Sequence, residues 1–518
     1  MVSLDSLRSS ANVPYIGLGG LIAFSIILLP VLYYGIWFIY NLYFHPLAKY
    51  PGPRLAGATP WWIALTYARG TTSADLLKVH NKYGPVVRTS PNELSYINPP
   101  QWKEIYGHRP PGQEEFAKDK KYHAGLKGKP LLINADRGYH SEIRKLFAHG
   151  FSEKALREQE PVLQGYVDLL MQKLRENSQD GHLPVDISMW YNFTTFDFVG
   201  FLTFGESFNC LQSSQLHKWV HIFFSLAKYM AYSQAISRMP RLIQTAAMTW
   251  GIPASVKSQV ATLHQLNKEK TKYRIECESQ VPDFMDKLID AYKSGKMTFG
   301  QIMGNGQLLI AAGSETTATL LSGLTFLLLK HSRVYEKLTK EIRGSFQSPE
   351  EITVVGVNRC KYLLACIEEA LRVYPPSPQP HHRVVPAGGA TVDGEYLPAG
   401  SIVSIPIYAI ANSALNWAEP ERFAPERWLL SEEKDGGRGS ADPRFANDRR
   451  EASQPFSFGP RNCIGRNLAY VEMKLIIAKL LWHFDLENAT EGDWMDQKVY
   501  MVWEKTPLWV KLHPLKRG

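Results

Sequence analysis

The chain has 518 residues, of which 45% are hydrophobic and 12% aromatic, enough to bury a large core. Its five cysteines have no regular spacing, which argues against a disulfide framework or a paired CxxC zinc site and favours a reducing compartment. The formal net charge is +9, but the basic residues are dispersed and no nucleic-acid motif occurs, so no nucleic-acid partner is expected.

The N-terminal region carries no charged residue from Ser9 to Phe44. About 20 apolar residues span a bilayer as a helix, and aromatic residues gather at the C-terminal end of this stretch, as at a membrane interface. A cleaved signal peptide is the alternative, but the stretch is too long and no small-residue cleavage site follows it. We therefore expect a short lumenal segment at 1–12, a transmembrane anchor at 13–44 and a stiff proline-rich hinge at 45–58.

The charges beside this stretch predict its orientation. Lys49 and Arg54 follow it, and a positive bias on that side places the C-terminal bulk in the cytosol. The glycosylation sequons at Asn192 and Asn488 are then expected to stay unmodified.

The pattern of residues 59–518 is mainly helical with a smaller β part, which indicates one large catalytic domain. Strand-like stretches occur at 85–89 and 401–407. The longest helix candidate runs from Thr298 to about Lys330, with Thr298 placed to cap its N-terminus. Residues 429–453 are polar and rich in Gly, Asp and Arg, and predict an exposed loop.

The long helix candidate contains residue types that are unfavourable in mid-helix, in the run from Ala311 to Thr317. Gly313 would let a flat ligand approach the backbone. Thr316 can turn its hydroxyl to a nearby carbonyl, which loosens a helical hydrogen bond, and Glu315 can relay protons. Taken alone, a Glu–Thr pair in a helix is usually solvated surface.

A single thiol stands in the glycine-rich run from Phe456 to Gly465, directly before an amphipathic pattern that starts at Leu468. A helix dipole favours negative charge at its N-terminus, so Cys463 is placed to be a thiolate. A thiolate can be a nucleophile or a metal ligand. The commonest fate of a free thiol is a buried structural cysteine.

The run around Cys463 resembles the haem-binding loop of the cytochrome P450 family, the haem-thiolate monooxygenases. Only Ser457 departs from the pattern, where glycine is usual; the matching residues are Phe456, Gly459, Arg461, Cys463 and Gly465. The run from Ala311 to Thr317 resembles the acid–threonine signature of the same family. The resemblance implies the cytochrome P450 fold, preceded here by one transmembrane helix.

The resemblance also assigns roles to these residues. Cys463 would be the axial ligand of the iron of haem b, and Thr316 with Glu315 would be the catalytic pair that handles oxygen and protons. Phe456, Gly465 and Gly313 would contact the haem.

Further family motifs are matched outside these two runs. Glu369 and Arg372 match the Glu-x-x-Arg motif, and with Arg427 of the Pro-Glu-Arg motif they would form a structural triad. The haem carboxylates would be held by cationic or hydrogen-bonding groups; the candidates are Arg461, Arg383, Arg144 and His140. His140 stands where the family has tryptophan.

Two histidines precede Arg383, but a zinc site is a weak interpretation of them. Adjacent side chains on an extended segment face opposite ways, and no acidic or thiol residue stands near His381 and His382 in the sequence. One of them is instead a candidate for facing the substrate. The apolar segment 239–253, broken by prolines, is either an ordinary buried loop or, as in relatives, a region that dips into the membrane.

The resemblance is strongest to fungal microsomal members of secondary metabolism, of the trichothecene C-15 hydroxylase type. It implies a monooxygenase of the endoplasmic reticulum membrane, with its catalytic domain in the cytosol, that oxidises an apolar terpenoid or polyketide. Electrons would come from NADPH through NADPH–cytochrome P450 reductase, with cytochrome b5 as a possible second partner. Basic residues could meet the acidic reductase; they are Arg444, Arg449, Arg450 and Lys474.

Other activities stay open at this point. Epoxidation, desaturation and ring coupling begin with the same oxidant as hydroxylation. An oxygen-independent haem-thiolate isomerase or dehydratase tends to lose the acid–threonine pair, which is intact here. A non-enzymatic binding protein attached to membrane lipid would have no reason to keep the thiol, the triad and the proton relay together.

Overall fold

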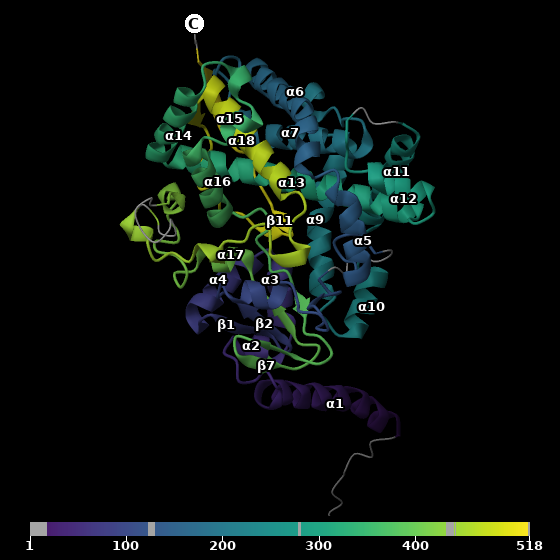
Figure 1. The fold of residues 1–518 in the computed structure, drawn as a ribbon. Coiled ribbons are helices and arrows are strands. Elements are labelled where there is room, and N and C mark those ends of the chain that lie inside the picture. The colour runs from purple at the N-terminus through teal and green to yellow at the C-terminus, as the bar shows by residue number, and fades with distance from the viewer. Residues whose placement is uncertain (1–17, 123–129, 278–280, 431–439, 441, 516–518) are drawn as a thin grey trace, which may run out of the picture.

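The computed structural model describes residues 18–122, 130–277, 281–430, 440 and 442–515. Helices dominate and gather around the long α13, while the short strands form separate small sheets, with β1, β2 and β7 near the base and the C-terminal strands toward the opposite end (Figure 1). The helices are α1 (Leu18–Ile39), α2 (Arg54–Ala58), α3 (Trp61–Arg69), α4 (Thr72–Tyr83), α5 (Arg137–Ala148), α6 (Glu153–Ser178), α7 (Ile187–Phe204), α8 (Cys210–Ser213), α9 (Lys218–Ile236), α10 (Arg241–Trp250), α11 (Ala254–Glu276), α12 (Asp286–Lys293), α13 (Phe299–Lys330), α14 (Ser332–Ser345), α15 (Val354–Val357), α16 (Lys361–Val373), α17 (Ile407–Asn412) and α18 (Arg466–His483). The mainly α fold with a smaller β part confirms the predicted class.

The strands form small sheets rather than one large sheet. They are β1 (Val86–Ser90), β2 (Glu93–Tyr96), β3 (Ala117–Lys118), β4 (Val185–Asp186), β5 (Arg383–Val384), β6 (Ala390–Val392), β7 (Glu395–Leu397), β8 (Ile402–Ser404), β9 (Phe484–Asn488), β10 (Val499–Tyr500), β11 (Val502–Trp503) and β12 (Trp509–Pro514). The five-stranded sheet has the order β1-β2-β8-β5-β3, with β1 antiparallel to β2 and β2 parallel to β8. The predicted strand at 401–407 ends at Ser404, since Pro406 cannot donate to a ladder and leads into α17.

Helix α13 is the axis of the helical part. Thr298 caps it in a capping box with Gln301, and the Thr298 N–H donates to Gln301 Oε1 at 2.9 Å, which confirms the predicted start. Gly313 lets α7 pack closely, because a Cβ there would lie 3.2 Å from both methyl carbons of Val199. Close packing against α7 is thus a reason for Gly313 that the sequence did not reveal.

Two groups of buried side chains make up the core. The larger one joins α6, α7, α13, α16 and α18, and the smaller one joins α3, β1, β2, β8 and α17. Helix α9 bridges them, with Trp219 and Val220 in the larger group and Ala235, near its other end, in the smaller. The site described below lies where these two parts of the molecule meet.

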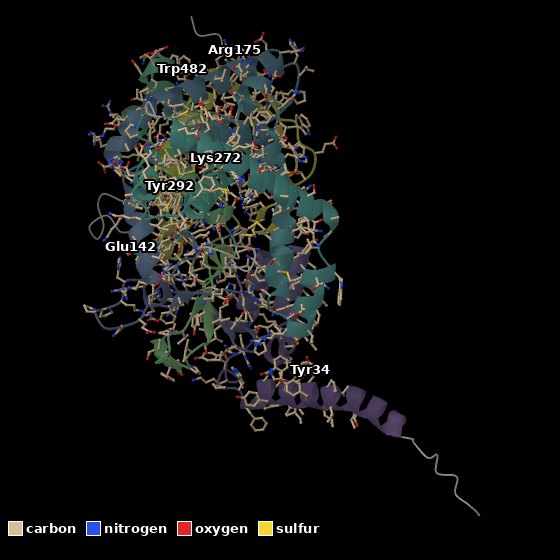
Figure 2. All side chains as sticks on the ribbon, turned by 90° about the vertical axis from the view of Figure 1, so that its right-hand side faces the viewer. Tyr34, Glu142, Arg175, Lys272, Tyr292 and Trp482 are labelled. Atoms are coloured by element: carbon tan, nitrogen blue, oxygen red, sulfur yellow. The ribbon has the colours of Figure 1, made fainter. Side chains whose placement is uncertain are left out.

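Helix α1 extends from the base of the molecule, and Tyr34 lies on it (Figures 1 and 2). Within the residues that the structure describes, no helix combines the length and apolar character needed to cross a membrane. The predicted lumenal segment 1–12 lies outside those residues. The predicted hinge is partly folded, since its last residues form α2 and Ala56 is buried.

Two predicted loops differ from expectation. Residues 239–253 contain helix α10, which buries none of its side chains and leaves Leu242 and Trp250 83% exposed, so a buried loop is wrong there. Residues 431–439 and 441 of the predicted exposed loop lie outside the described part. Its end is only partly exposed: Arg444, Asn447 and Glu451 are exposed as predicted, whereas Phe445 and the Asp448 side chain are fully buried.

Candidate active site

One cavity of about 420 Å³ collects most of the predicted site residues. Cys463 and Thr316 both line it, from the loop before α18 and from α13. Other predicted residues in its lining are Phe456, Gly465, Gly313, Arg461, Arg383, Arg144 and His140. Glu315 is absent from this lining, and the triad of Glu369, Arg372 and Arg427 lies elsewhere.

The loop before α18 holds the Cys463 thiol toward this cavity. The N–H of Cys463 donates to the Phe456 carbonyl at 2.9 Å. Gly459 has φ +75°, and a Cβ there would lie 2.0 Å from the Tyr106 carbonyl oxygen, so no larger residue fits. Ser457 has φ +61°, a left-handed conformation that explains why glycine is usual at this position.

The Cys463 side chain is exposed to the cavity, and desolvation by the protein around that cavity raises the pKa of its thiol, against the lowering effect of the Gly465 N–H, Arg144 and Arg466. A bare thiolate is therefore disfavoured in this cavity, and a positively charged partner such as a metal ion would stabilise it. The geometry of the loop thus suits a metal ligand.

Unpaired positive charge lines the same cavity. Arg383 is 4% exposed, its Nε is buried, and in the described part of the chain no residue accepts a hydrogen bond from it. Burial lowers its pKa to about 10. Lys118 lies close by, donates to the Ile133 carbonyl at 2.5 Å, and has a pKa held well below its usual value by burial and by Arg383. Lys118 has intermediate exposure, whereas Arg383 is a buried cation without an anionic partner among the described residues, and the carboxylates of a haem would balance its charge.

The remaining predicted anchors have partners of their own. Arg144 grips the loop, donating to the Asn462 carbonyl at 2.7 Å and to its side-chain oxygen at 2.6 Å. Arg461 donates to the Ala135 carbonyl at 2.7 Å and pairs with Glu115, while its buried Nε has no acceptor among the described residues. Burial and Arg461 lower the pKa of His140 to about 3, so its imidazole is neutral and one ring nitrogen can donate a hydrogen bond.

The predicted catalytic pair is split between two faces of α13. Thr316 lines the cavity and donates its hydroxyl hydrogen to the Ala312 carbonyl at 2.7 Å, in a helix that stays continuous. Glu315 is 1% exposed, points to a separate pocket of about 290 Å³, and pairs there with Lys505. Lys505 also donates to Thr319 Oγ1 at 2.6 Å.

A second buried carboxyl group lines the cavity from α18. Glu472 is 2% exposed, and burial raises its pKa to about 8, against the lowering effect of a hydrogen bond with Thr317 on α13. Its Oε1 has no partner among the described residues. Glu472 is therefore mostly protonated at neutral pH.

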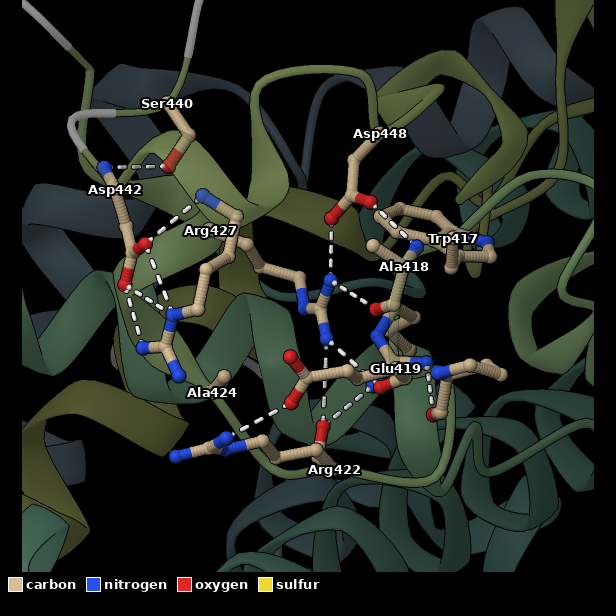
Figure 3. A network of polar contacts seen from close by, with 12 residues as sticks. Trp417, Ala418, Glu419, Arg422, Ala424, Arg427, Ser440, Asp442 and Asp448 are labelled. Atoms are coloured by element: carbon tan, nitrogen blue, oxygen red, sulfur yellow. Dashed lines mark hydrogen bonds and ion pairs between the residues drawn. The ribbon is translucent and has the colours of Figure 1, made fainter.

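The predicted triad is present and has a fourth member. Glu369 Oε1 accepts from Arg427 Nε at 2.9 Å and from Arg372 at 2.8 Å. Arg427 also pairs with Asp448, whose other oxygen accepts from the Ala418 N–H at 2.7 Å (Figure 3). All four side chains are fully buried, and the two carboxylates balance the two guanidinium groups.

The two histidines before β5 lie at the cavity and form no metal site. Within the described residues, no cluster of three or more potential metal ligands occurs. The ring of His382 lies 5.4 Å from that of Tyr122, and His381 Nε2 lies 3.4 Å from Ser377 Oγ. Both histidines line the cavity, as predicted for one of them.

The four basic residues predicted to contact a reductase interact with other residues of the chain or are partly buried. Arg444 pairs with Asp442 at 2.6 Å, and Arg449 donates to Asn98 at 2.8 Å. Lys474 donates to Asn358 at 2.8 Å, and burial lowers the pKa of Lys474 and of Arg450. A different concavity, of about 640 Å³, is rich in basic groups beside the Cys463 loop; they are His108, Arg109, Arg137, His140, Arg144 and Lys145.

Sequence reasoning missed Lys118, Glu472, Lys505 and Asp448. Each belongs to a segment that carries no local motif. Asp448 lies in a stretch whose polarity predicted solvent exposure, and Lys505 comes near Glu315 only through the fold.

Comparison with known proteins agrees with this geometry. The family model described as Cytochrome P450 matches residues 53–511. The chain is 43% identical to the cytochrome P450 monooxygenase hepD of Aspergillus oryzae, with both chains fully covered. It is also 40% identical to the averantin hydroxylase of Dothistroma septosporum, covering 92% of this chain and 88% of that protein. The trichothecene C-15 hydroxylase of Fusarium sporotrichioides is 40% identical, with 92% and 95% covered.

Proposed function

The chain belongs to the cytochrome P450 family and is a monooxygenase, and from this premise we propose that it hydroxylates an apolar terpenoid or polyketide intermediate of fungal secondary metabolism. The observation that carries the proposal is that Cys463 and Thr316 line one largely apolar cavity together with buried, unpaired cations. The hydroxylases among the relatives support the reaction type.

Haem b held by Cys463 would supply the oxidising chemistry, with a thiolate ligand that favours cleavage of the O–O bond. Arg383, Lys118 and Arg461 would hold its carboxylates, and His140 would donate one further hydrogen bond. The chain supplies the charge balance, since these cations lie in a buried wall without enough anions of their own.

Proton handling falls to residues of α13. Thr316 and Thr317 of this helix both line the cavity; the Thr316 hydroxyl can pass a hydrogen bond between the Ala312 carbonyl and a reacting group, whereas Thr317 contacts Glu472. Glu315 is positioned behind it by Lys505, at the inner end of a separate pocket. Protons would reach Thr316 by crossing from the Glu315 side of the helix.

Alternative activities share most of this site. The intact Thr316 favours oxygen-dependent chemistry over an isomerase or dehydratase. Epoxidation, desaturation and ring coupling differ from hydroxylation in the substrate bond that is placed next to the oxidant. Turnover that requires both NADPH and dioxygen would distinguish these oxygen-dependent activities from an isomerase or dehydratase.

The proposed electron donor is NADPH–cytochrome P450 reductase, with cytochrome b5 as a possible second donor. The basic concavity beside the Cys463 loop supports docking of an acidic partner there, because Arg137 and Lys145 are exposed at its rim. Pro460 and Asn462 of the thiol loop line this surface, so a docked partner would contact the loop directly.

We also propose attachment to the endoplasmic reticulum membrane, with residues 13–44 as anchor and the catalytic domain in the cytosol. Exposed apolar side chains support contact with lipid on α1 and α10, which lie at the same end of the molecule (Figure 1); they include Leu29, Val31, Ile36, Leu242 and Trp250. The sequon at Asn488 tests the orientation, because a glycan there would place the domain in the lumen. Asn192 is only 5% exposed, so the absence of a glycan there would not distinguish the two orientations.

The decisive experiment is spectroscopic and metabolic. The reduced protein with carbon monoxide should show the strongly red-shifted Soret band of thiolate-ligated haem, and Cys463→Ala should not. Candidate pathway intermediates are then fed to a strain that expresses the protein. A gain of one oxygen atom in the product mass supports hydroxylation or epoxidation; a loss of two hydrogens indicates desaturation or coupling.

A further inference from the structure

One corner of the cavity is polar for reasons that haem binding and proton handling do not explain. It is formed by Gln234 of α9, Tyr122, His381 and His382, and is called the polar corner below. Near it α9 also presents Met230 to the cavity, one turn before Gln234 on the same face. A polar group at such a place needs a partner.

Gln234 has an unused hydrogen-bonding atom. It is 2% exposed, and its Nε2 donates to the Tyr122 carbonyl at 3.0 Å. That bond fixes the orientation of the amide, so Oε1 remains as an acceptor. Across the described ranges of the chain, no residue donates a hydrogen bond to this oxygen. A buried acceptor without a donor destabilises the fold, and a ligand in the cavity can supply the donor.

The surroundings of Gln234 favour a neutral donor. Burial, Lys118 and Arg383 lower the pKa of His381 to about 3, so its ring is uncharged. Behind the corner, the buried Glu93 lies 3.5 Å from Arg238 and 3.9 Å from His382 Nε2. A carboxylate ligand would bring a second acceptor to Gln234 Oε1 and a second anion near Glu93. An alcohol or a phenol brings the missing donor without charge.

We infer that the substrate is an apolar molecule that already carries a neutral hydroxyl group, and that Gln234 Oε1 accepts a hydrogen bond from it. The inference deepens the proposed function and rests on it. Gln234 lies next to Ala235 of the smaller core group, whereas Ile464, the neighbour of Cys463, packs on the larger one. The hydroxyl would therefore hold one end of the molecule at the polar corner, so that apolar carbons are presented to the Cys463 and Thr316 side.

The test measures ligand binding to the haem-loaded protein, without NADPH, through the shift of the Soret band. The probes are 2-naphthol, which donates a hydrogen bond, and 2-methoxynaphthalene, which has no donor. Since a hydrogen bond that is made or lost is worth about a factor of ten in affinity, the wild-type protein should bind 2-naphthol about tenfold more tightly. Gln234→Leu, which keeps the size of the side chain, should lose this preference. Met230→Leu, one turn away in the same lining, should keep it.

Equal preference in wild type and Gln234→Leu would overturn the inference, as would a wild-type protein that responds to neither probe. The carbon monoxide spectrum is recorded for every variant, so a failure of haem-thiolate binding is recognised as a failure of the proposed function instead. The wild-type comparison of the two probes stands even if Gln234→Leu does not fold.

Discussion

At the scale of single residues, the structure explains why glycine is usual at the position of Ser457 in the family pattern. Its φ of +61° places an L-residue in the left-handed region next to the thiol loop. Such a conformation costs roughly 1–2 kcal/mol for a residue with a Cβ. Its hydroxyl oxygen is buried and accepts nothing from the described residues, so no hydrogen bond compensates the strain there.

Ser457→Gly should therefore stabilise the protein. The expected gain in the free energy of unfolding is about 1 kcal/mol, because glycine adopts this conformation without strain. Thermal unfolding followed by circular dichroism measures it, together with the temperature of haem release. Ser453→Gly is the matched control, since Ser453 has φ −82° and should gain nothing. A Ser457→Gly protein that melts no higher than wild type would contradict the argument.

Thr316→Ala should still bind haem, but more of the electrons from NADPH should form hydrogen peroxide instead of oxidised product. The substitution removes the hydroxyl that lines the cavity and leaves Cys463 and the cations untouched. We expect an unchanged carbon monoxide spectrum, with a larger share of consumed NADPH recovered as hydrogen peroxide. Undiminished coupling of NADPH to product would remove Thr316 from the proton path.

At the scale of elements, neighbouring positions on α13 serve different sides of the helix. Thr316 and Glu315 are adjacent in sequence, but the helical period directs one to the cavity and the other to Lys505. Helices α13 and α18 are joined by the Glu472–Thr317 contact, which places a protonated carboxyl group in the cavity wall.

Glu472 makes stability depend on pH. Its pKa is raised to about 8 in the folded protein, so between pH 4.5 and 8 the folded state holds a proton that the unfolded state has lost. This group therefore reduces stability progressively as pH rises through that range. Glu472→Gln lacks the effect and should become more stable relative to wild type as pH increases. Melting temperatures of both proteins at pH 5.5 and pH 8 measure this, and a constant difference would refute it.

The buried ion cluster connects α16 to the turn at Pro425–Trp428 and to the segment around Asp448. Figure 3 shows the pairing of Arg427 with Asp448. Removing Asp448 leaves two guanidinium groups against one carboxylate. Asp448→Ala should therefore cost about 3–5 kcal/mol and impair haem incorporation, as should Glu369→Ala. Asp442→Ala is the control, because its ion pair with Arg444 is exposed to solvent and should contribute little to stability. Chemical denaturation measures all three, and a small loss for Asp448→Ala would show that the cluster needs only three members.

At the scale of the whole molecule, charge and apolar surface are separated. The basic concavity lies beside the thiol loop, and the exposed apolar residues of α1 and α10 lie at the base. A partner could therefore reach the loop while the base contacts the membrane that we propose.

Lys145→Glu should slow electron transfer from the reductase, because it places a negative charge on the proposed docking surface. Stopped-flow reduction by the reductase at low salt measures the rate, and dithionite reduction should be unchanged. Arg444→Glu is the comparison, since Arg444 is already paired with Asp442. A larger effect of Arg444→Glu would move the docking surface to the side first predicted from the sequence.

The sequence by itself determined the family, the thiol loop, the capped long helix and the three-residue part of the ion cluster, because each is written in residues close together in the chain. Only the tertiary structure decided what surrounds them. Asp448, Lys505, Glu472, Lys118 and Gln234 acquire their roles from neighbours that are distant in sequence. Polarity alone predicted that the segment of Asp448 is exposed, whereas burial follows from the charge balance of two arginines that the fold brings to it. Local sequence patterns cannot predict which charges pair over long distances or which cavity a helical side chain faces, because both depend on how the chain packs.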